Sequence, residues 1–263
     1  MPIKKSCFLL LLSLCSFIIG FAQDNYEIQV YGSPTIEKGS TMLELHSNFT
    51  FKGQDPLSKG ILPTNHVFHE TIEITHGWNE WFETGFYIFN TIGTDKRSNY
   101  VGSHIRPRVM APLSWHLPVG LSLSVEAGYQ KRDYSEDDWT VEFRPIIDKQ
   151  MGKFYWSLNP AFAKSIHGAN KNMGYVFSPN VKTSYNITKK IATGLEYYGS
   201  VGPLSHMQPI ESQQHQLFFV VDVDVNPDWE FNCGYGRGFT KSTDNDILKM
   251  ILGYKFHKKA KHA

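Results

Sequence analysis

Charged residues of both signs recur at every second position in several stretches, for example in His104–Arg108 and Glu142–Arg144. Alternate side chains of a β-strand point to the same side, so this spacing predicts a charged face shared by many strands. Because an isolated charge in a dry interior is costly, we expect this face to be hydrated or ion-paired. The residues assigned to it are Glu44, His46, Glu73, Glu83, His104, Arg106, Arg108, Glu126, Glu142, Arg144, Asp148, Lys182, Glu196, Asp222, Asp224 and Lys249.

Two interpretations of the charged face stay open. In the first, the residues form salt bridges that fill a narrow interior; in the second, they line a passage and select solutes, as rings of charged side chains do in channels. Adjacent predicted strands bring Arg106, Arg108 and Arg144 near Glu126 and Glu142, so a constriction is expected there. Direct pairing of these groups would shut the passage, whereas water between them would let ions and polar solutes cross.

Patterns typical of enzymes or bound cofactors are weak. His46, His69 and His104 have no serine partner at an informative spacing, so a membrane-embedded hydrolase is a minor alternative and no catalytic residue is expected. His66 and His69 lack the further ligands of a closed metal site. The glycines of 234–238 lie in a predicted strand with no helix after it, unlike a phosphate-binding loop. We therefore predict no enzyme, no metal and no cofactor.

The elements that position the charged face are predicted from alternating hydropathy. Apolar and polar residues alternate through Leu121–Gln130, Trp139–Asp148 and Phe154–Ala163. Each run is near the ~9–11 residues of a tilted membrane strand and longer than the ~5–6 of an ordinary globular strand. Twelve strands are predicted, at 41–52, 67–77, 81–92, 100–111, 121–130, 138–148, 153–164, 173–186, 191–200, 214–225, 229–239 and 246–256.

The connections between these strands alternate in length. The odd-numbered ones are polar and mostly long, as in Gly53–His66 and Val201–Gln213, and the even-numbered ones are mostly tight. This asymmetry with an even strand count is typical of an antiparallel up-and-down transmembrane β-barrel. The rival is a secreted β-sandwich or lipocalin-like barrel. Proline cannot donate to a ladder, so bulges are expected at Pro107, Pro145, Pro160 and Pro179.

The apolar face of the strands is predicted to face lipid. It contains Leu43, Leu45, Phe49, Ile72, Ile74, Phe86, Ile88, Ile105, Val109, Leu195, Leu217, Phe219, Val221, Val223, Leu248, Met250 and Leu252. The predicted strand at 81–92 is apolar on both faces, as if part of its inner side were covered. Aromatic residues make up 14% of the chain and charged residues 19%, which suits a barrel with aromatic girdles and a polar interior.

The amino-terminal residues predict export. Basic residues, an apolar run from Cys7 to Ile19 and small residues before a cleavage point after Ala22 form a signal peptide at 1–22. Cleavage leaves Cys233 as the one cysteine, so no intramolecular disulfide is expected. Residues 23–40 are interpreted as a periplasmic lead-in or a plug, 41–256 as the barrel and 257–263 as a basic tail. The near-neutral charge argues against a nucleic-acid partner.

The sequence resembles a broad group of uncharacterised bacterial outer-membrane β-barrels described as porin-like or transporter-like. The resemblance rests on the signal ending Gly20–Gln23, on Arg106–Arg108, on Trp139–Pro145 and on the final Gly253–Phe256. It implies a Gram-negative outer-membrane location, with membrane lipid and the barrel-assembly machinery as partners. It brings no binding residues with it and does not indicate the oligomeric state.

The functional hypothesis is a small channel or transporter that passes polar or amphiphilic solutes through the charged lumen. The alternative is a non-conducting barrel with a structural or surface-binding role through its long loops. Twelve strands lie between the about 8 that side chains can fill and the about 16–18 that leave an open aqueous channel. Strand number therefore does not choose between these two hypotheses.

Overall fold

A computed structural model describes residues 25–54, 60–94 and 97–257. The predicted signal peptide at 1–22 and all of the predicted tail except His257 lie outside these ranges. The long strands are β1 (Thr41–Lys52), β2 (Val67–Gly77), β3 (Phe82–Ile92), β4 (Ser98–Met110), β5 (Gly120–Gln130), β6 (Asp137–Met151), β7 (Phe154–Gly168), β8 (Val176–Asn186), β9 (Ile191–Ser200), β11 (Gln214–Asn226), β12 (Trp229–Gly238) and β13 (Asp246–Phe256). Three short elements are β10 (Gly202–Pro203) and the 3-10 turns η1 (Leu113–Trp115) and η2 (Ile210–Ser212).

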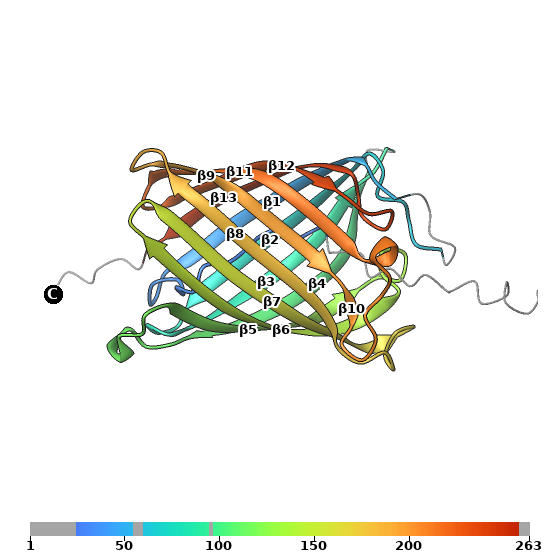
Figure 1. The fold of residues 1–263 in the computed structure, drawn as a ribbon, viewed down its shortest axis with the longest axis horizontal. Helices are drawn as coiled ribbons and strands as arrows, with labels where there is room; N and C mark the ends of the chain where they lie inside the picture. Colours follow the sequence, from blue (N-terminus) through green and yellow to red (C-terminus); the bar gives the residue numbers. More distant parts are fainter. Residues whose placement is uncertain (1–24, 55–59, 95–96, 258–263) are drawn as a thin grey trace, which may run out of the picture.

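The twelve long strands form one closed antiparallel barrel (Figure 1). Each pairs with its neighbours along the chain, β8 pairs with β9, and the ring closes where β1 pairs with β13. At this seam Thr41 lies opposite Phe256 and Thr50 lies opposite Ile247. The predicted fold class is confirmed, with every predicted strand present. No helix within the described ranges is long and apolar enough to cross a membrane.

The two faces of the wall differ as the alternation predicts. Apolar side chains assigned to the outer face are exposed, including Leu43, Ile74, Ile105 and Phe219 at 42%, 42%, 53% and 57%. Many of the charged residues assigned to the inner face are buried inside the ring. One strand register thus sets both surfaces, because successive residues point to opposite sides of the sheet.

The expectation of bulges at the four mid-strand prolines is wrong. Pairing stops for a few residues beside Pro107 and between Pro145 and Pro160, but the register is the same on both sides of each gap. Pro160 lies opposite Pro179 on β8. Each proline removes a hydrogen bond locally without an extra residue in its strand, so the ring still closes. The register shifts fall elsewhere, at Thr50/Lys52, Phe89/Asn90 and Val223/Asn226 and near Trp139.

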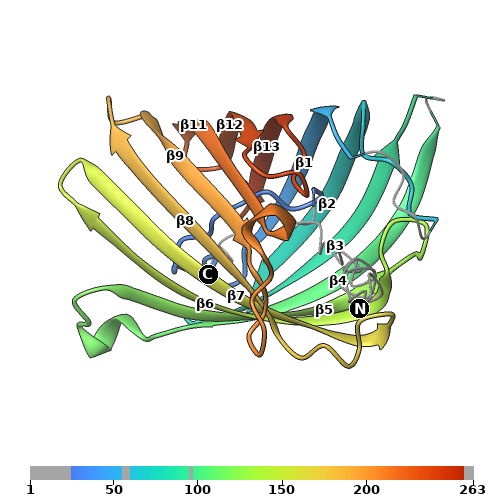
Figure 2. The same cartoon turned by 45° about the vertical axis from the view of Figure 1, so that its right-hand side comes forward.

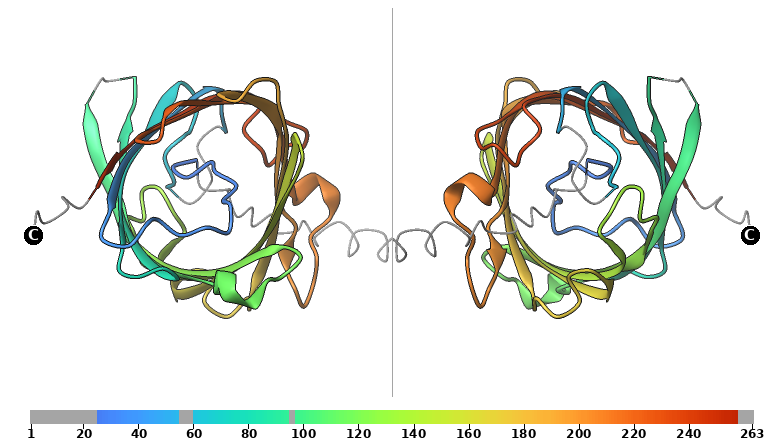
Figure 3. Two further views of the ribbon diagram at one scale, coloured as in Figure 1. Left: turned by 90° about the vertical axis from the view of Figure 1, so that its left-hand side faces the viewer. Right: turned by 90° about the vertical axis from the view of Figure 1, so that its right-hand side faces the viewer.

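The segment before β1 lies inside the ring, as the end-on views in Figure 3 and the tilted view in Figure 2 show. We call residues 25–36 the inner segment. It starts near the long loops, where Asn48 Nδ2 donates to the carbonyl oxygen of Asn25, and ends near the short turns, where Ile36 N donates to Glu83. We call these two ends of the barrel the loop end and the turn end. The stretch 23–40, interpreted as a lead-in or a plug, thus lies inside the barrel over residues 25–36.

Candidate functional site

Apolar side chains of the inner segment pack against the inside of the wall. Ile28 and Val30 contact Tyr198, Phe218, Val220 and Ile247, which form one buried cluster. Tyr26 packs with Tyr87, Phe89 and Val101 in a second cluster. These contacts explain why β3 is apolar on both faces, since its inner aromatics are covered by Tyr26 rather than by water. The segment is thus held by the hydrophobic effect as well as by polar bonds.

The backbone of the inner segment is not in a strand, and side chains of the wall satisfy it. Thr71 Oγ1 donates to the carbonyl oxygen of Tyr26 over 2.7 Å, and Lys249 Nζ donates to that of Ile28 over 3.0 Å. Ser157 Oγ and Asn159 Nδ2 donate to the carbonyl oxygen of Tyr31, whose N–H donates back to Asn159 Oδ1. Buried backbone groups need such partners, so the polar wall fixes the path of the segment.

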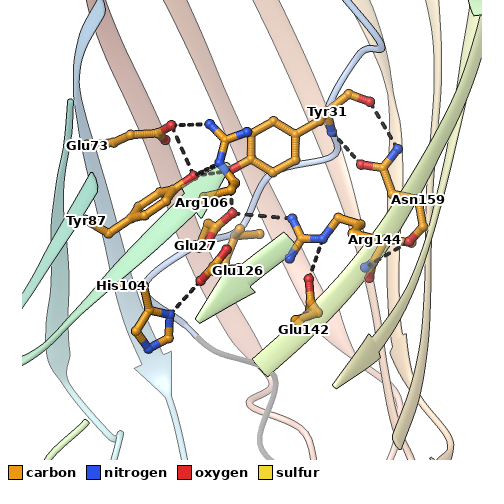
Figure 4. Close-up of polar contacts among 12 residues, drawn as sticks. Glu27, Tyr31, Glu73, Tyr87, His104, Arg106, Glu126, Glu142, Arg144 and Asn159 are labelled. Carbon is orange, nitrogen blue, oxygen red and sulfur yellow. Dashed lines mark hydrogen bonds and ion pairs between the residues drawn. The ribbon is translucent and has the colours of Figure 1, made fainter. Parts of the chain in front are cut away.

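Tyr31 of the inner segment lies among three arginines, two of which, Arg106 and Arg144, are labelled beside it in Figure 4. The guanidinium carbons of Arg106, Arg144 and Arg108 are 4.7, 5.3 and 5.6 Å from its ring centroid, within the range of cation–π attraction. Its hydroxyl donates to Glu27. Tyr31 is not among the site residues predicted from the alternating pattern. The one available signal was the short alternating run Glu27–Tyr31, in which the tyrosine falls on the same side as Glu27.

Arg106 and Arg108 pair with acids that differ from the expected ones. Arg106 lies 2.6 Å from Glu73, and Glu83 lies 2.7 Å from Arg108 and 3.4 Å from Arg106. Arg106 reaches Glu73 across β3 because Gly85 stands opposite it, where a Cβ would lie 3.2 Å from the guanidinium. Arg108 also donates to the carbonyl oxygens of residues 32 and 34, at 3.0 and 2.9 Å. These arginines therefore fasten the inner segment to the wall.

Only part of the expected constriction is brought together. Arg144 pairs with Glu142 at 2.7 Å and with Glu27 of the inner segment at 3.3 Å. Glu126 instead lies 2.5 Å from the imidazole Nδ1 of His104. The centre of the lumen is thus a layer of direct ion pairs with a tyrosine in its middle.

A second ion-pair network lies on the opposite wall. Lys182 on β8 is 3.0 Å from Glu196 and 2.8 Å from Asp222. Glu196 also pairs with Lys249 and accepts a 2.7 Å hydrogen bond from the Tyr198 hydroxyl. Each cation here touches at least one carboxylate, which offsets the cost of holding these charges away from bulk water.

The remaining predicted site residues lie nearer the turn end. Asp148 accepts hydrogen bonds from the N–H of Ser33 and from the Tyr155 hydroxyl. Asp224 is exposed near the end of β11. Glu44 and His46 are buried side by side on β1, with Glu73 next to them on β2.

Two cavities enter the barrel, one from each end. The loop-side cavity has a volume of about 500 Å³ and is lined by residues such as Glu126, Glu136 and Asp244. The turn-side cavity has a volume of about 750 Å³ and is lined by residues such as Glu44 and Asp224. Residues of the inner segment line both cavities, so this segment lies between them.

The outer end of the inner segment is tied to a loop through Asp244. This carboxylate accepts hydrogen bonds from Asn25 Nδ2, from Thr64 Oγ1 at 2.7 Å and from the Gln54 N–H at 2.9 Å. Burial raises the pKa of Asp244 above its ordinary range despite these three donors, so its charged form is held at a cost. Asp244 thereby connects the loop after β12 to the inner segment.

Comparison with known proteins identifies barrels of the same fold. No family model matches the sequence, and no curated protein matches it. Among solved structures, the chain is similar to an outer-membrane channel from Pseudomonas putida F1, with a TM-score of 0.56, 9% identity and coverage of 88% of this chain and 100% of the other.

Two further structures are similar to the same degree. For the KdgM porin the TM-score is 0.54 at 10% identity, and for the NanC porin it is 0.54 at 9% identity. Each likeness covers 82% of this chain and 99% of the other. The resemblance to outer-membrane porin-like β-barrels is therefore confirmed as a likeness of fold.

Proposed function

We propose that this protein is an outer-membrane channel for small polar solutes whose passage is limited by the inner segment. The observation that carries the proposal is the position of the obstruction. The two cavities are separated by residues of a segment that belongs to no strand, rather than by the barrel wall alone. Movement of that segment would join the cavities and leave the hydrogen-bonded ring intact. Solved barrels of this fold are described as channels and porins, which supports a transport role over catalysis.

A membrane location is proposed from the outer surface. The apolar side chains on the outer face form a belt around the ring, and exposed tryptophans occur near the strand ends at Trp78, Trp81, Trp139 and Trp229. Such aromatic residues are typical of the two interfaces of a membrane barrel. Membrane lipid and the barrel-assembly machinery are the partners that follow from this location, and we place the long loops outside the cell.

An arginine at the middle of the outer face tests the membrane location. Met250 lies at the centre of β13 with its side chain on the lipid-facing side. Met250→Arg should lower the free energy of unfolding in lipid vesicles by about 2–4 kcal/mol, because the charge would enter hydrocarbon. Leu113→Arg is the control, since Leu113 is 82% exposed in η1, outside the strands. Equal tolerance of both substitutions would contradict a membrane-embedded wall.

Acidic residues outnumber basic residues in the lining of both cavities. Among described residues, the loop-side lining has six Asp or Glu against two Lys or Arg. The turn-side lining has eight Asp or Glu against six Lys or Arg. Acidic rings select cations in channels, so we propose that the solutes are neutral or positively charged.

Conductance in planar bilayers under a salt gradient tests channel function and selectivity together. We expect the wild type to conduct ions, with a reversal potential whose sign is that of a cation-selective channel. Asp224→Lys, at the turn-side mouth, should shift this potential toward the anion side, and Glu211→Gln in the exposed η2 turn should leave it unchanged. If neither the wild type nor a chain without the inner segment conducts, the barrel is non-conducting. It would then have a structural or surface-binding role through loops such as 53–66 and 201–213.

A further inference from the structure

Three buried side chains at the seam side of the lumen are arranged like metal ligands. Glu44 and His46 alternate on β1, and Glu73 stands directly opposite Glu44 on β2. One ligand atom from each lies within 4.8 Å of the others, and all three residues are buried. We propose that Glu44, His46 and Glu73 bind a divalent transition-metal ion of the Zn²⁺ type. This inference does not depend on the proposed channel function.

His46 provides the second, independent observation. It is 0% exposed, and within the described ranges its Nδ1 has no hydrogen-bond partner. Its Nε2 and Glu73 Oε2 have no contact of good hydrogen-bond geometry there, although they are close enough for an ion pair. Leaving buried polar atoms without partners is costly, and these atoms face each other with His46 Nε2 3.2 Å from Glu73 Oε2. A metal between them would occupy both, since ligand bonds of about 2.0–2.2 Å place N and O on one ion about 3–3.4 Å apart.

The turn-side cavity gives access to this cluster. Glu44 and Glu230 both line it, and they flank Gly253, which lies opposite each of them in the sheet. A Cβ on Gly253 would lie 3.0 Å from Glu44 Cγ, so the glycine leaves this carboxylate room to turn toward the cavity. No hydrogen bond or ion pair involves the Glu44 carboxylate in the part of the chain that the structure describes. It is therefore available to an entering cation.

The neighbouring arginine shapes the site without filling it. Arg106 binds Glu73 through Oε1, which also accepts from Thr75 and Tyr87, while Oε2 remains directed at His46. The positive charge of Arg106 repels the proposed metal ion. The negative charges of Glu44 and Glu83 offset this repulsion. One imidazole with two carboxylates suits Zn²⁺-like ions, whereas Ca²⁺ and Mg²⁺ prefer all-oxygen shells.

Titration of the untagged, chelator-treated mature protein in detergent tests the site. We expect isothermal titration with Zn²⁺ to show one ion per chain, retained when Mg²⁺ or Ca²⁺ is in excess. Glu44→Gln and His46→Gln should each weaken binding by at least about 100-fold, because loss of an outer-shell partner alone costs 10–100-fold. Cu²⁺ loaded into the wild type should show one coupled nitrogen in its electron paramagnetic resonance spectrum, and His46→Gln should abolish it.

Controls separate this site from the protein surface and from misfolding. Glu70→Gln and His76→Gln change the outer side of β2, where these residues bond to Ser47 and Thr41, and should leave Zn²⁺ affinity unchanged. Folding of each variant is checked by gel electrophoresis. A folded barrel should migrate differently before and after heating, by the same shift as the wild type. Absence of Zn²⁺ binding by the wild type would overturn the proposal. So would binding that survives Glu44→Gln and His46→Gln but is lost in His257→Gln, since His257 contacts Glu37 and Asp228 at the surface.

Discussion

Deleting residues 25–36 should raise the single-channel conductance several-fold and turn an obstructed lumen into a continuous one. The segment separates cavities of about 500 and 750 Å³, and none of its residues belongs to the ring of strands. Its removal takes away the contacts of the segment in two apolar clusters and several hydrogen bonds to the wall, but it breaks no strand pairing. The measurement is conductance in planar bilayers at fixed salt, with circular dichroism to check strand content.

The matched control deletes a stretch of chain outside the lumen. Residues 205–211 belong to the excursion around η2, which lies beside the ring in the end-on views of Figure 3. Their removal should leave conductance at the wild-type level. If deletion of 25–36 gives a folded barrel that conducts no better than the wild type, the inner segment is not the limiting obstruction. The ion-pair layers of the wall would then close the lumen by themselves.

Replacing Arg106 with alanine should destabilise the protein by about 3–5 kcal/mol, because removal of one partner leaves buried charges uncompensated. Arg106 is 2% exposed and contacts Glu73, Glu83 and the Tyr31 ring. Both acids are 0% exposed, so water from the cavities cannot readily replace the guanidinium. Urea unfolding in detergent or lipid measures the loss.

Two further variants identify the cause of that loss. Arg132→Ala removes an arginine whose side chain is 66% exposed and 3.5 Å from Asp138, and should cost at most about 1 kcal/mol. The double variant Arg106→Met/Glu73→Gln should recover part of the stability, since it removes both charges. Destabilisation by Arg106→Ala no larger than by Arg132→Ala would show that the lumen is hydrated at this depth.

The barrel could be predicted because one physical pattern determines it. The ranges 41–52, 67–77, 191–200 and 246–256 coincide with β1, β2, β9 and β13. In the middle of β1 and β2 apolar outer residues alternate with polar inner ones, as in Ile72–Thr75, and polar connections bound all four strands. Strands β6 and β7 run three or four residues past the predicted ends, to Met151 and Gly168. These final residues include only Met151 and Ile166 as apolar side chains, which is too few to show an alternation, and strand pairing extends the two strands.

The contacts of the lumen could not be predicted in the same way. Alternation gives the face of a side chain but not its partner, which depends on the offset between strands. Arg106 therefore reaches over Gly85 to Glu73, two strands away, rather than to Glu126 on the next strand. The cluster at Glu44 requires knowledge that Glu73 stands opposite it. Tyr31 was missed because its run is too short to be placed by periodicity.

The path of the inner segment has a consequence for biogenesis. From Asn25, the first described residue, at the loop end, the chain passes through the ring and reverses into β1 at the turn end. The ring closes where β1 meets β13, the first and last strands, so the segment can be laid in place before closure, whereas later entry would require threading a chain end through a crowded pore. A compact domain fused ahead of residue 23 would then obstruct assembly, and the same domain fused after residue 263 would not. The path of residues 25–40 therefore implies that the inner segment is placed before β1 and β13 pair.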